Sequence, residues 1–401
     1  MLLTFVMLFK TSLNKNKQRL KMKKLQLLLA AVLISVIGYS QENSSDTYQN
    51  SGSKLLNDNL PKGVTIGGYA QIDYNEPDGS APGKLDIHRL VLLFGYKFNE
   101  KVSFLTEIEY EHVQEVYVEQ AYLKYKLNES ANILAGLMLV PMGIINEYHE
   151  PTTFYGVERP NVDNVIVPTT WRELGVGISG KIDNASLKYQ AYLFNGFKSY
   201  AGGAGIIKGS NGLRSGRQKG AESFVSSPNL SSKLDYYGIP GLRVGLSGYF
   251  GKTQTDDSSI EASTVGVSMI GLDARYKYNN LELRGQYINA NLSDTEDYNT
   301  LTGKDLGSKM TGLYGEIAYN FNLKGEEKLT PFLRFEKYNT HAETEGTLVA
   351  NKAFDKNELI FGLNYKVANG AAFKIDYQLV NNAVSGSDTS KIFNAGVAIW
   401  F

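Results

Sequence analysis

Most of the chain beyond residue 64 alternates between apolar and polar residues with a period of two. The pattern is clear in residues 85–98, 101–113 and 264–278, where apolar side chains, many of them aromatic, fall at every second position and charges occupy the positions between. This is the period of a β-strand, whose side chains point alternately to opposite faces. The sequence therefore predicts an all-β protein in which one face of each strand is apolar.

About fifteen such segments, each of roughly nine to fifteen residues, can be recognised between residues 64 and 401. Tight turn signals lie at 99–100, 128–130, 183–184, 279–280 and 369–370, and long connections lie at 75–84, 141–170, 197–240, 292–307 and 341–355. Short turns at one end and long loops at the other are typical of a transmembrane antiparallel β-barrel. Bacterial barrels of one chain have even strand numbers, so we expect one missed strand and a total of sixteen.

A soluble β-sandwich or a repeat array is the alternative, but these rarely sustain strands of ten or more residues with charge on one face and aromatics on the other. A mean hydropathy of −0.25 excludes a bundle of transmembrane helices. Tyrosines near strand ends suggest an interfacial aromatic girdle. They are Tyr69, Tyr74, Tyr96, Tyr110, Tyr117, Tyr125, Tyr278, Tyr319, Tyr338 and Tyr365.

The first forty residues have the pattern of a secretory signal peptide. An apolar run from Leu25 to Ile37 follows Lys23 and Lys24 and ends in small residues before a cut after Ser40. A single membrane anchor would need about 20 apolar residues, and a polar segment follows instead. We expect residues 1–40 to be a signal peptide with an upstream extension, Met22 to be the true start, residues 41–63 to be a flexible segment and residues 64–401 to form the barrel. Export into a barrel predicts the outer membrane of a Gram-negative bacterium.

The formal charge of the whole chain is zero, with 41 basic and 41 acidic residues. Residues 1–40 hold seven basic residues and no acid, so the exported chain would carry 34 positive and 41 negative charges, a net charge of −7. An acidic chain lacks the basic excess of nucleic-acid-binding proteins, so we expect no nucleic-acid partner. The absence of cysteine excludes disulfides, thiolate metal sites and cysteine nucleophiles.

Alternation also predicts which charges face the lumen, and these are of both signs. The pore-lining candidates on the strands are Arg89, Lys124, Lys188, Arg243, Arg275, Arg284, Arg334, Glu107 and Glu109. Further inward positions are Lys97, Lys277, Lys366, Lys374, Glu111, Glu173, Asp273, Glu282, Glu316, Glu336, Glu358 and Asp376. Rings of one sign select ions, whereas mixed signs pair with one another. Cross-strand pairs such as Arg275 with Asp273, or Arg284 with Glu282 or Glu336, are favoured over an anion relay.

Several segments carry a family resemblance. They read VPTTWRELGVGISGKI at 167–182, ASLKYQAYLFNG at 185–196 and SPNLSSKLDYYGIPGLRVGLSGYFG at 227–251, with Ile399, Trp400 and Phe401 at the end. Together with residues 136–138 they resemble the phosphate-selective porin O and P family, from about Val64 to the end. The resemblance implies a sixteen-stranded, trimeric diffusion channel whose pore is narrowed by an infolded loop. The family's namesakes use inward arginines and a lysine cluster for anions, from which the mixed lumen charge departs.

The long connection 141–170 is the most interesting candidate site, because a loop of this length is usually functional. Its apolar residues could let it fold into the barrel. Its charged residues would then set the charge at the constriction, and they are Glu147, His149, Glu150, Glu158 and Arg159. Packing against neighbouring subunits of a trimer is the other interpretation.

Other chemistry has little support in the sequence. Glu147 and His149 have a spacing that could bind a metal, but no third ligand is evident, so we expect no metal site and no cofactor. Arg214, Arg217 and Lys219 lie in a Gly- and Ser-rich segment, for which a solvated loop tip is favoured over an anion site. Nothing places a nucleophile beside a histidine, so we expect no catalytic residues.

The sequence therefore predicts passive transport of small hydrophilic solutes or ions, with phosphate or other anions among them, through a water-filled pore. Its partners would be the outer-membrane bilayer, the solutes and two further copies of the chain. The alternative is a barrel that acts as a surface receptor or adhesin through loops 197–240 and 292–307.

Overall fold

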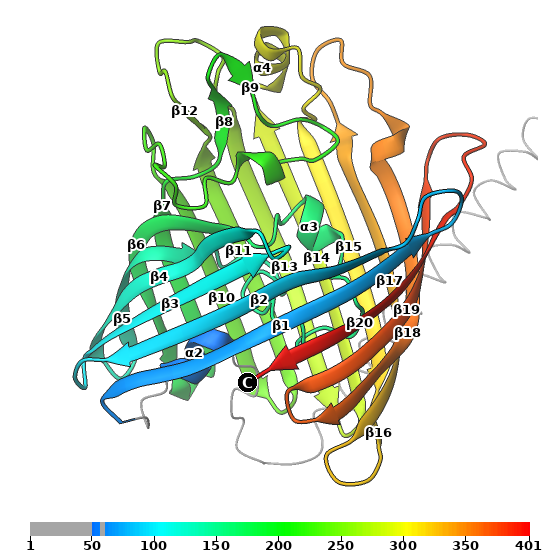
Figure 1. The fold of residues 1–401 in the computed structure, drawn as a ribbon. Helices are drawn as coiled ribbons and strands as arrows, with labels where there is room; N and C mark the ends of the chain where they lie inside the picture. The colour runs from blue at the N-terminus through cyan, green and yellow to red at the C-terminus, as the bar shows by residue number, and fades with distance from the viewer. Residues whose placement is uncertain (1–49, 57–60) are drawn as a thin grey trace, which may run out of the picture. The chain divides into compact units, whose positions relative to one another are not determined.

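The computed structural model of the protein describes residues 50–56 and 61–401, and within these residues sixteen antiparallel strands form one closed barrel (Figure 1). The barrel strands are β1 (Gly63–Pro77), β2 (Lys84–Lys97), β3 (Val102–Glu111), β4 (Glu115–Asn128), β5 (Ala131–Leu139), β6 (Arg172–Ile182), β7 (Leu187–Phe194), β10 (Asn229–Ile239), β11 (Leu242–Lys252), β13 (Gly266–Tyr278), β14 (Leu281–Ser293), β15 (Lys309–Tyr319), β17 (Lys328–Glu343), β18 (Asp355–Ala368), β19 (Ala371–Asn382) and β20 (Ser390–Trp400). The predicted signal peptide, residues 1–40, lies outside the described residues.

The first and last strands close the barrel. β1 pairs antiparallel with β20 from Tyr69 opposite Trp400 to Pro77 opposite Ile392, so blue and red strands run side by side in Figure 1. Gly68 and Phe401 extend the seam by exchanging two backbone hydrogen bonds of 2.9 Å. Closure leaves no unpaired strand edge, which a bilayer requires because it offers the backbone no water.

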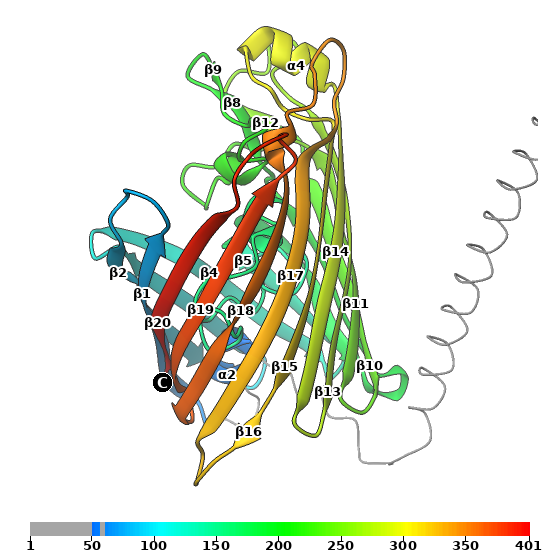
Figure 2. The same ribbon diagram turned by 90° about the vertical axis from the view of Figure 1, so that its right-hand side faces the viewer.

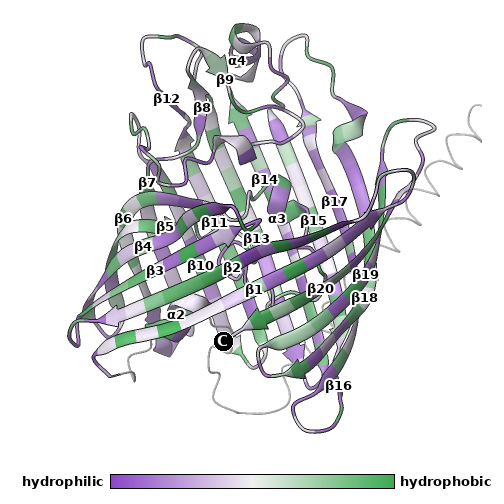
Figure 3. Cartoon of the chain, viewed as in Figure 1, coloured by the Kyte–Doolittle hydropathy of each residue, from purple (hydrophilic) through white to green (hydrophobic). Residues whose placement is uncertain are grey.

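The two faces of the strands differ in the way that a membrane barrel requires. Along β13, Leu272 is 53% exposed on the outer face whereas its neighbour Asp273 is 1% exposed on the lumen face. Figure 3 shows the same alternation as green and purple bands along the strands. No helix among the described residues is long and apolar enough to cross a membrane.

The sixteenth strand is β10, and it lies in the segment predicted to be the long loop 197–240. That prediction was wrong for residues 229–239, which pair with β7 on one side and with β11 on the other. The strand alternates like the others, with Leu234 outside and Lys233 and Asp235 inside. The glycines and serines that precede it concealed a short strand within a longer polar segment.

Two β-bulges interrupt the alternation on the lumen side of β1–β4. Gln71 pairs with Arg89 but Asp73 pairs with Asp86, so β2 has an extra residue there. β4 has another extra residue, Glu119, between the pairs made by Gln120 and by Val118. A bulge brings consecutive side chains to the same face, and here it leaves Glu119 and Gln120 both buried in the lumen.

The aromatic prediction was wrong at three positions, because Tyr69, Tyr117 and Tyr338 point into the lumen. Tyr69 and Tyr338 have exposed fractions of 0% and 5%, and their hydroxyl groups donate hydrogen bonds to Glu107 and Glu358. Tyr117 lies opposite the buried Glu109 of β3. Tyr96, Tyr110, Tyr125, Tyr278 and Tyr319 are exposed on the outer face. Parity within each strand decides the direction, and position near a strand end does not.

The connections between the barrel strands carry small elements of their own (Figure 2). These are β8 (Lys198–Ala201), β9 (Ala204–Gly205), β12 (Gln254–Thr255), β16 (Phe321–Asn322), α3 (Val162–Val165), α4 (Thr295–Thr302) and the 3₁₀ turns at Asp183–Ala185, Arg214–Gly216 and Lys352–Phe354. Tyr298 of α4 is fully buried, and its hydroxyl group donates to Ser199 O at 2.9 Å and contacts the amide groups of Ile206 and Ile207. The loops 195–228 and 294–308 therefore pack against each other.

A short helix, α2 (Ser51–Leu55), precedes the first strand and packs on the inner wall. Leu55 is buried against Tyr69, Val91, Leu93 and Leu105. Lys54 lies 4.1 Å from the centre of the Trp400 ring. Within the segment predicted to be flexible, 41–63, residues 51–55 are thus helical and packed, because Leu55 and Leu56 give an otherwise polar stretch an apolar surface to bury.

Candidate functional site

Loop 141–170 lies inside the barrel. Its Met142, Ile144, Phe154, Val162 and Ile166 join one buried cluster with side chains that line the lumen, which are Tyr249, Met269, Ile288, Tyr314 and Tyr338. Of the two interpretations of its apolar content, the structure supports burial within the lumen over contact with another subunit.

Basic side chains hold the backbone of this loop. Lys374 donates to three carbonyl groups, those of Pro151, Phe154 and Gly156, at 2.5–2.8 Å. Arg284 donates to Thr153 O at 2.9 Å. Three more wall or rim residues do the same: Lys233 to Gly143 O, Arg334 to Glu158 O and Arg217 to Pro168 O and Thr170 O. The inward cations therefore satisfy carbonyl groups that a buried loop would otherwise leave unpaired.

Two acidic side chains and a glutamine accept hydrogen bonds from amide groups of the same loop. Val157 N donates to Asp376 Oδ2 at 2.7 Å and Val162 N to Glu336 Oε2 at 3.1 Å. Gln286 accepts from Ile144 N at 2.6 Å. The mixed charge predicted for the lumen is thus largely the set of partners for one inserted loop.

Some lumen charges also pair across strands, but the predicted partners were wrong for Arg284. Its guanidinium lies 2.9 Å from Glu316, and Arg334 lies 2.8 Å from Glu336 and 3.5 Å from Glu316. Antiparallel register explains the choice, because Glu316 lies directly opposite both arginines on its two neighbouring strands. Arg275 stacks 4.4 Å from the centre of the Tyr148 ring in the loop.

His149 forms a buried node between the loop and the wall. Its Nε2 lies 2.9 Å from the Tyr69 hydroxyl, 3.2 Å from Glu119 and 3.6 Å from Glu107. Nδ1 lies 3.1 Å from Asn146 O. The carboxylates come from the wall, whereas the sequence-based hypothesis considered only Glu147, which turns away.

Glu147 contacts a second group of charges on the opposite wall. Lys233 Nζ lies 3.0 Å from Glu147 and 3.6 Å from Asp273, and Lys188 lies 3.7 Å from Glu147. Asp235 completes the group with a 2.8 Å ion pair to Arg243. Lys233 and Asp235 were missed because β10 was missed, although their own alternation with Leu234 was a usable signal.

The loop separates two cavities. The first, which we call the loop-side cavity, has a volume of about 470 Å³ and opens toward the long connections. Its charged lining residues are Arg89, Glu109, Glu111, Glu119, Glu158, Arg159, Asp163, Arg172, Arg214, Arg217 and Lys219, with His88 and His112.

The second, the turn-side cavity, has a volume of about 400 Å³ and lies near the tight turns. Its charged lining residues are Lys124, Lys126, Glu129, Glu147, Lys181, Asp183 and Lys188, and α2 contributes Gly52 and Ser53. Glu119 lines the loop-side cavity while its neighbour Gln120 lines the turn-side cavity. The two cavities therefore come close together at the β4 bulge, beside His149.

The fourteen candidate site residues from the sequence thus fall into distinct places. The residues that line the loop-side cavity are Arg89, Glu109, Glu158 and Arg159, and those that line the turn-side cavity are Lys124, Lys188 and Glu147. Four arginines lie between the wall and the loop, and they are Arg243, Arg275, Arg284 and Arg334. The buried cluster between loop and wall contains Glu107 and His149. Glu150 accepts a 2.7 Å hydrogen bond from Ser51 N of α2.

The prediction of a solvated tip for Arg214, Arg217 and Lys219 was wrong. Arg214 donates to Asn164 O and Thr169 O, and Lys219 lies 4.4 Å from the centre of the Tyr117 ring. Burial, followed by the neighbouring charges of Arg214 and Arg172, lowers the pKa of Arg217 below its ordinary value. These side chains gather positive charge at the loop-side cavity, because the loop that carries them folds down onto loop 141–170.

A closed sixteen-stranded barrel with an apolar outer face and a loop inserted in its lumen defines a channel of the outer-membrane porin class. The chain belongs to the phosphate-selective porin O and P family, whose pattern matches residues 64–391. An uncharacterized protein of Aquifex aeolicus (strain VF5) is 32% identical over 362 residues, which cover 85% of this chain and 81% of that protein.

Solved structures share the fold. The outer-membrane channel DcaP of Acinetobacter baumannii has a TM-score of 0.57 at 12% identity, and OmpF of Salmonella typhi in complex with daunomycin has a TM-score of 0.55 at 13% identity. Each match covers 84% of this chain and 97% of the other. At such identities the likeness shows the fold alone; membership of the porin family, together with the barrel, points to a bacterial outer membrane.

Proposed function

We propose that this protein is a passive diffusion channel for small hydrophilic solutes in the outer membrane of a Gram-negative bacterium, with a preference for small anions such as phosphate. The observation that carries the proposal is the inserted loop 141–170, which separates two polar cavities inside a closed barrel. Transport down a gradient needs no chemical step and no cofactor.

The inserted loop supports a size limit. It is held by hydrogen bonds to its backbone from several strands, including those of Lys374, Asp376 and Glu336. A loop fixed from many sides keeps its position as solutes pass, so it acts as a constriction and not as a mobile flap. Glu119 lines the loop-side cavity and Gln120 lines the turn-side cavity, so we place the passage between the two cavities beside these residues.

The anion preference rests on the balance of charge in the loop-side cavity. Arg89 and Arg172 have carboxylate partners there, in Glu109 at 3.4 Å and Glu119 at 3.2 Å. Arg214 and Arg217 instead donate to backbone carbonyl groups, which do not cancel their charge. Uncompensated positive charge at a pore entrance concentrates anions and repels cations. The family's phosphate label supports the same choice.

The assembly we expect is a homotrimer in the outer-membrane bilayer, as the family resemblance implies. The alternative of a receptor or adhesin depended on freely exposed loops 197–240 and 292–307. Tyr298 instead buries one of these loops against the other, and part of 197–240 is the barrel strand β10. No observation on these loops favours the receptor over the channel.

Recording from planar bilayers tests the proposal. Purified protein should give stable single-channel steps in KCl, and a KCl gradient should give a reversal potential of the sign for chloride preference. Added phosphate should reduce the chloride current by competing for the loop-side cavity. Absence of channel steps would reject the diffusion channel, whereas a reversal potential of the opposite sign would reject only the anion preference.

A further inference from the structure

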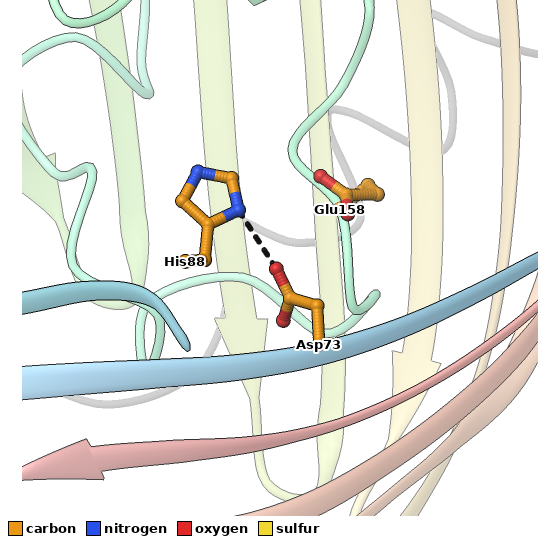
Figure 4. Close-up of side chains that lie close together, drawn as sticks. All are labelled: Asp73, His88 and Glu158. Atoms are coloured by element: carbon orange, nitrogen blue, oxygen red, sulfur yellow. Dashed lines mark hydrogen bonds and ion pairs between the residues drawn. The ribbon is translucent and has the colours of Figure 1, made fainter. Parts of the chain in front are cut away.

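Three potential metal ligands meet where the β2 bulge faces the loop. Figure 4 shows Asp73 of β1, His88 of β2 and Glu158 of loop 141–170 turned toward one another. His88 Nδ1 lies 2.8 Å from Asp73 Oδ2, and one ligand atom from each of the three residues lies within 4.8 Å of the others. We propose that these three residues form a binding site for a divalent transition-metal ion such as Zn²⁺.

The bulge is what creates the arrangement. With regular alternation along β2, Arg89 would face the lumen and His88 would face the lipid. The extra residue that β2 has at the bulge lets both side chains line the loop-side cavity. Asp73 is 2% exposed, so its carboxylate is fixed in the wall. Glu158 is oriented by a 3.1 Å hydrogen bond from Asn75 Nδ2. Two of the three ligands are therefore positioned before an ion arrives.

The donor set favours a transition metal over the hard cations. One imidazole nitrogen and two carboxylate oxygens suit Zn²⁺, Cu²⁺ or Ni²⁺, whereas Ca²⁺ and Mg²⁺ prefer oxygen ligands alone. The ion would take the place of the proton that His88 shares with Asp73. His88 and Glu158 both line the cavity, so the ion has a route of entry and a coordination position left for water or an anion.

A second cluster in the described residues has the same ligand types, and comparison with it sharpens the assignment. His149, Glu107 and Glu119 also lie within 4.8 Å of one another. Both ring nitrogens of His149 are already hydrogen-bonded, to Tyr69 and to Asn146 O, and its side chain is buried. His88 faces its triad with Nδ1, whose hydrogen-bond partner, Asp73, is itself one of the proposed ligands, and its side chain is 21% exposed.

Bound metal would link the loop to the wall. Asp73 and His88 belong to adjacent barrel strands, whereas Glu158 belongs to the loop and adjoins Arg159 in the same cavity. The positive charges of Arg89 and Arg159 oppose a cation, so we expect reversible binding that yields to a chelator. An ion at this position would also obstruct the loop-side entrance.

Isothermal titration of the detergent-purified full chain with ZnCl₂ tests the site without reference to transport. We expect one ion per chain, with at least a tenfold loss of affinity in both His88→Gln and Glu158→Gln. His112→Gln is the matched control, because His112 lies in the same cavity with its ring 5.6 Å from that of His88 but is outside the ligand triad. Its affinity should equal that of the wild type.

Three outcomes would overturn the assignment: no stoichiometric Zn²⁺ binding by the wild type, unchanged binding in His88→Gln, or loss of binding in His112→Gln alone. Glutamine can still donate to Asp73, so His88→Gln should fold, and Glu158→Gln provides an independent variant on the loop. Zn²⁺ added on the loop side should also lower single-channel conductance in a manner that EDTA reverses. This last measurement rests on the proposed channel function; the titration stands without it.

Discussion

The two cavities on either side of loop 141–170 are similar in size but differ in how their charges are neutralised. In the turn-side cavity two of the four lysines lie near acids: Lys126 is 2.9 Å from Glu129 and Lys188 is 3.7 Å from Glu147. In the loop-side cavity Arg214 and Arg217 satisfy their donors with carbonyl groups instead. A hydrogen bond to a carbonyl group satisfies a guanidinium without cancelling its charge, so we expect Arg214 and Arg217 to strengthen the positive field on the loop side.

Removing the separation between the cavities should have the largest effect. Deletion of residues 152–159 takes away the central part of the loop, including Glu158 and Arg159, and should raise single-channel conductance several-fold. Deletion of the exposed residues 384–388 in the connection between β19 and β20 is the matched control. Equal conductance in the two deletions would mean that the loop does not constrict the pore.

The second-largest effect is expected from neutralising two cations of the loop-side cavity, which should reduce the anion preference. In the double variant Arg214→Gln and Arg217→Gln, glutamine can still donate to the carbonyl groups while the charge is removed. We expect the chloride-to-potassium permeability ratio, measured from reversal potentials, to fall several-fold. Lys126→Gln in the turn-side cavity should leave the ratio nearly unchanged because that lysine is paired with Glu129. A larger change in Lys126→Gln would reverse the comparison.

His149 should contribute to the stability of the protein at the boundary between the two cavities. In His149→Leu the carboxylates of Glu107 and Glu119 lose their shared partner while remaining buried, a change that typically costs about 3–5 kcal/mol. Urea unfolding of the protein in lipid vesicles measures the loss of stability. His112→Gln, at a half-exposed histidine, should cost far less. A loss of stability under about 1 kcal/mol in His149→Leu would show that the node is not a structural anchor.

The smallest effect is expected at α2, which lies beside the turn-side cavity. Leu55→Ser removes the apolar contact with Val91, Leu93 and Leu105, worth about 1.5–3 kcal/mol for a buried leucine. Release of the helix should raise conductance modestly, with no change in ion preference. Ser53→Ala, at a residue hydrogen-bonded only to Asn50 among the described residues, is the control. A shift in ion preference would mean that α2 has a role in selectivity as well.

The barrel could be predicted from the sequence, but only part of the candidate site could. Alternation predicts the lumen face of Arg89, Glu107 and Asp273 correctly, because parity is a local property of an unbroken strand. It fails for His88 and Glu119, because a β-bulge shifts parity by one residue and leaves no mark in residue type.

The partners of the lumen charges were harder still. Lys374 was predicted to face inward, but its three acceptors are carbonyl oxygens of a loop more than 200 residues away. Backbone carbonyl groups are the same in every residue, so no sequence pattern reveals which of them a lysine will find. Glu147 and His149, two residues apart, were considered as one site, yet the loop turns them to different walls of the barrel.

The anchoring of loop 141–170 through its backbone has a consequence for how such channels diversify. Lys374, Arg284 and Arg334 hold carbonyl oxygens, which remain in place whatever side chain each loop residue carries. Exchange of Glu158 or Arg159 therefore changes the chemistry that a passing solute meets and leaves the fastening intact. The groups that hold the loop are therefore separate from the side chains that meet the solute. Permeation properties can change one substitution at a time while the loop stays anchored and the protein stays folded.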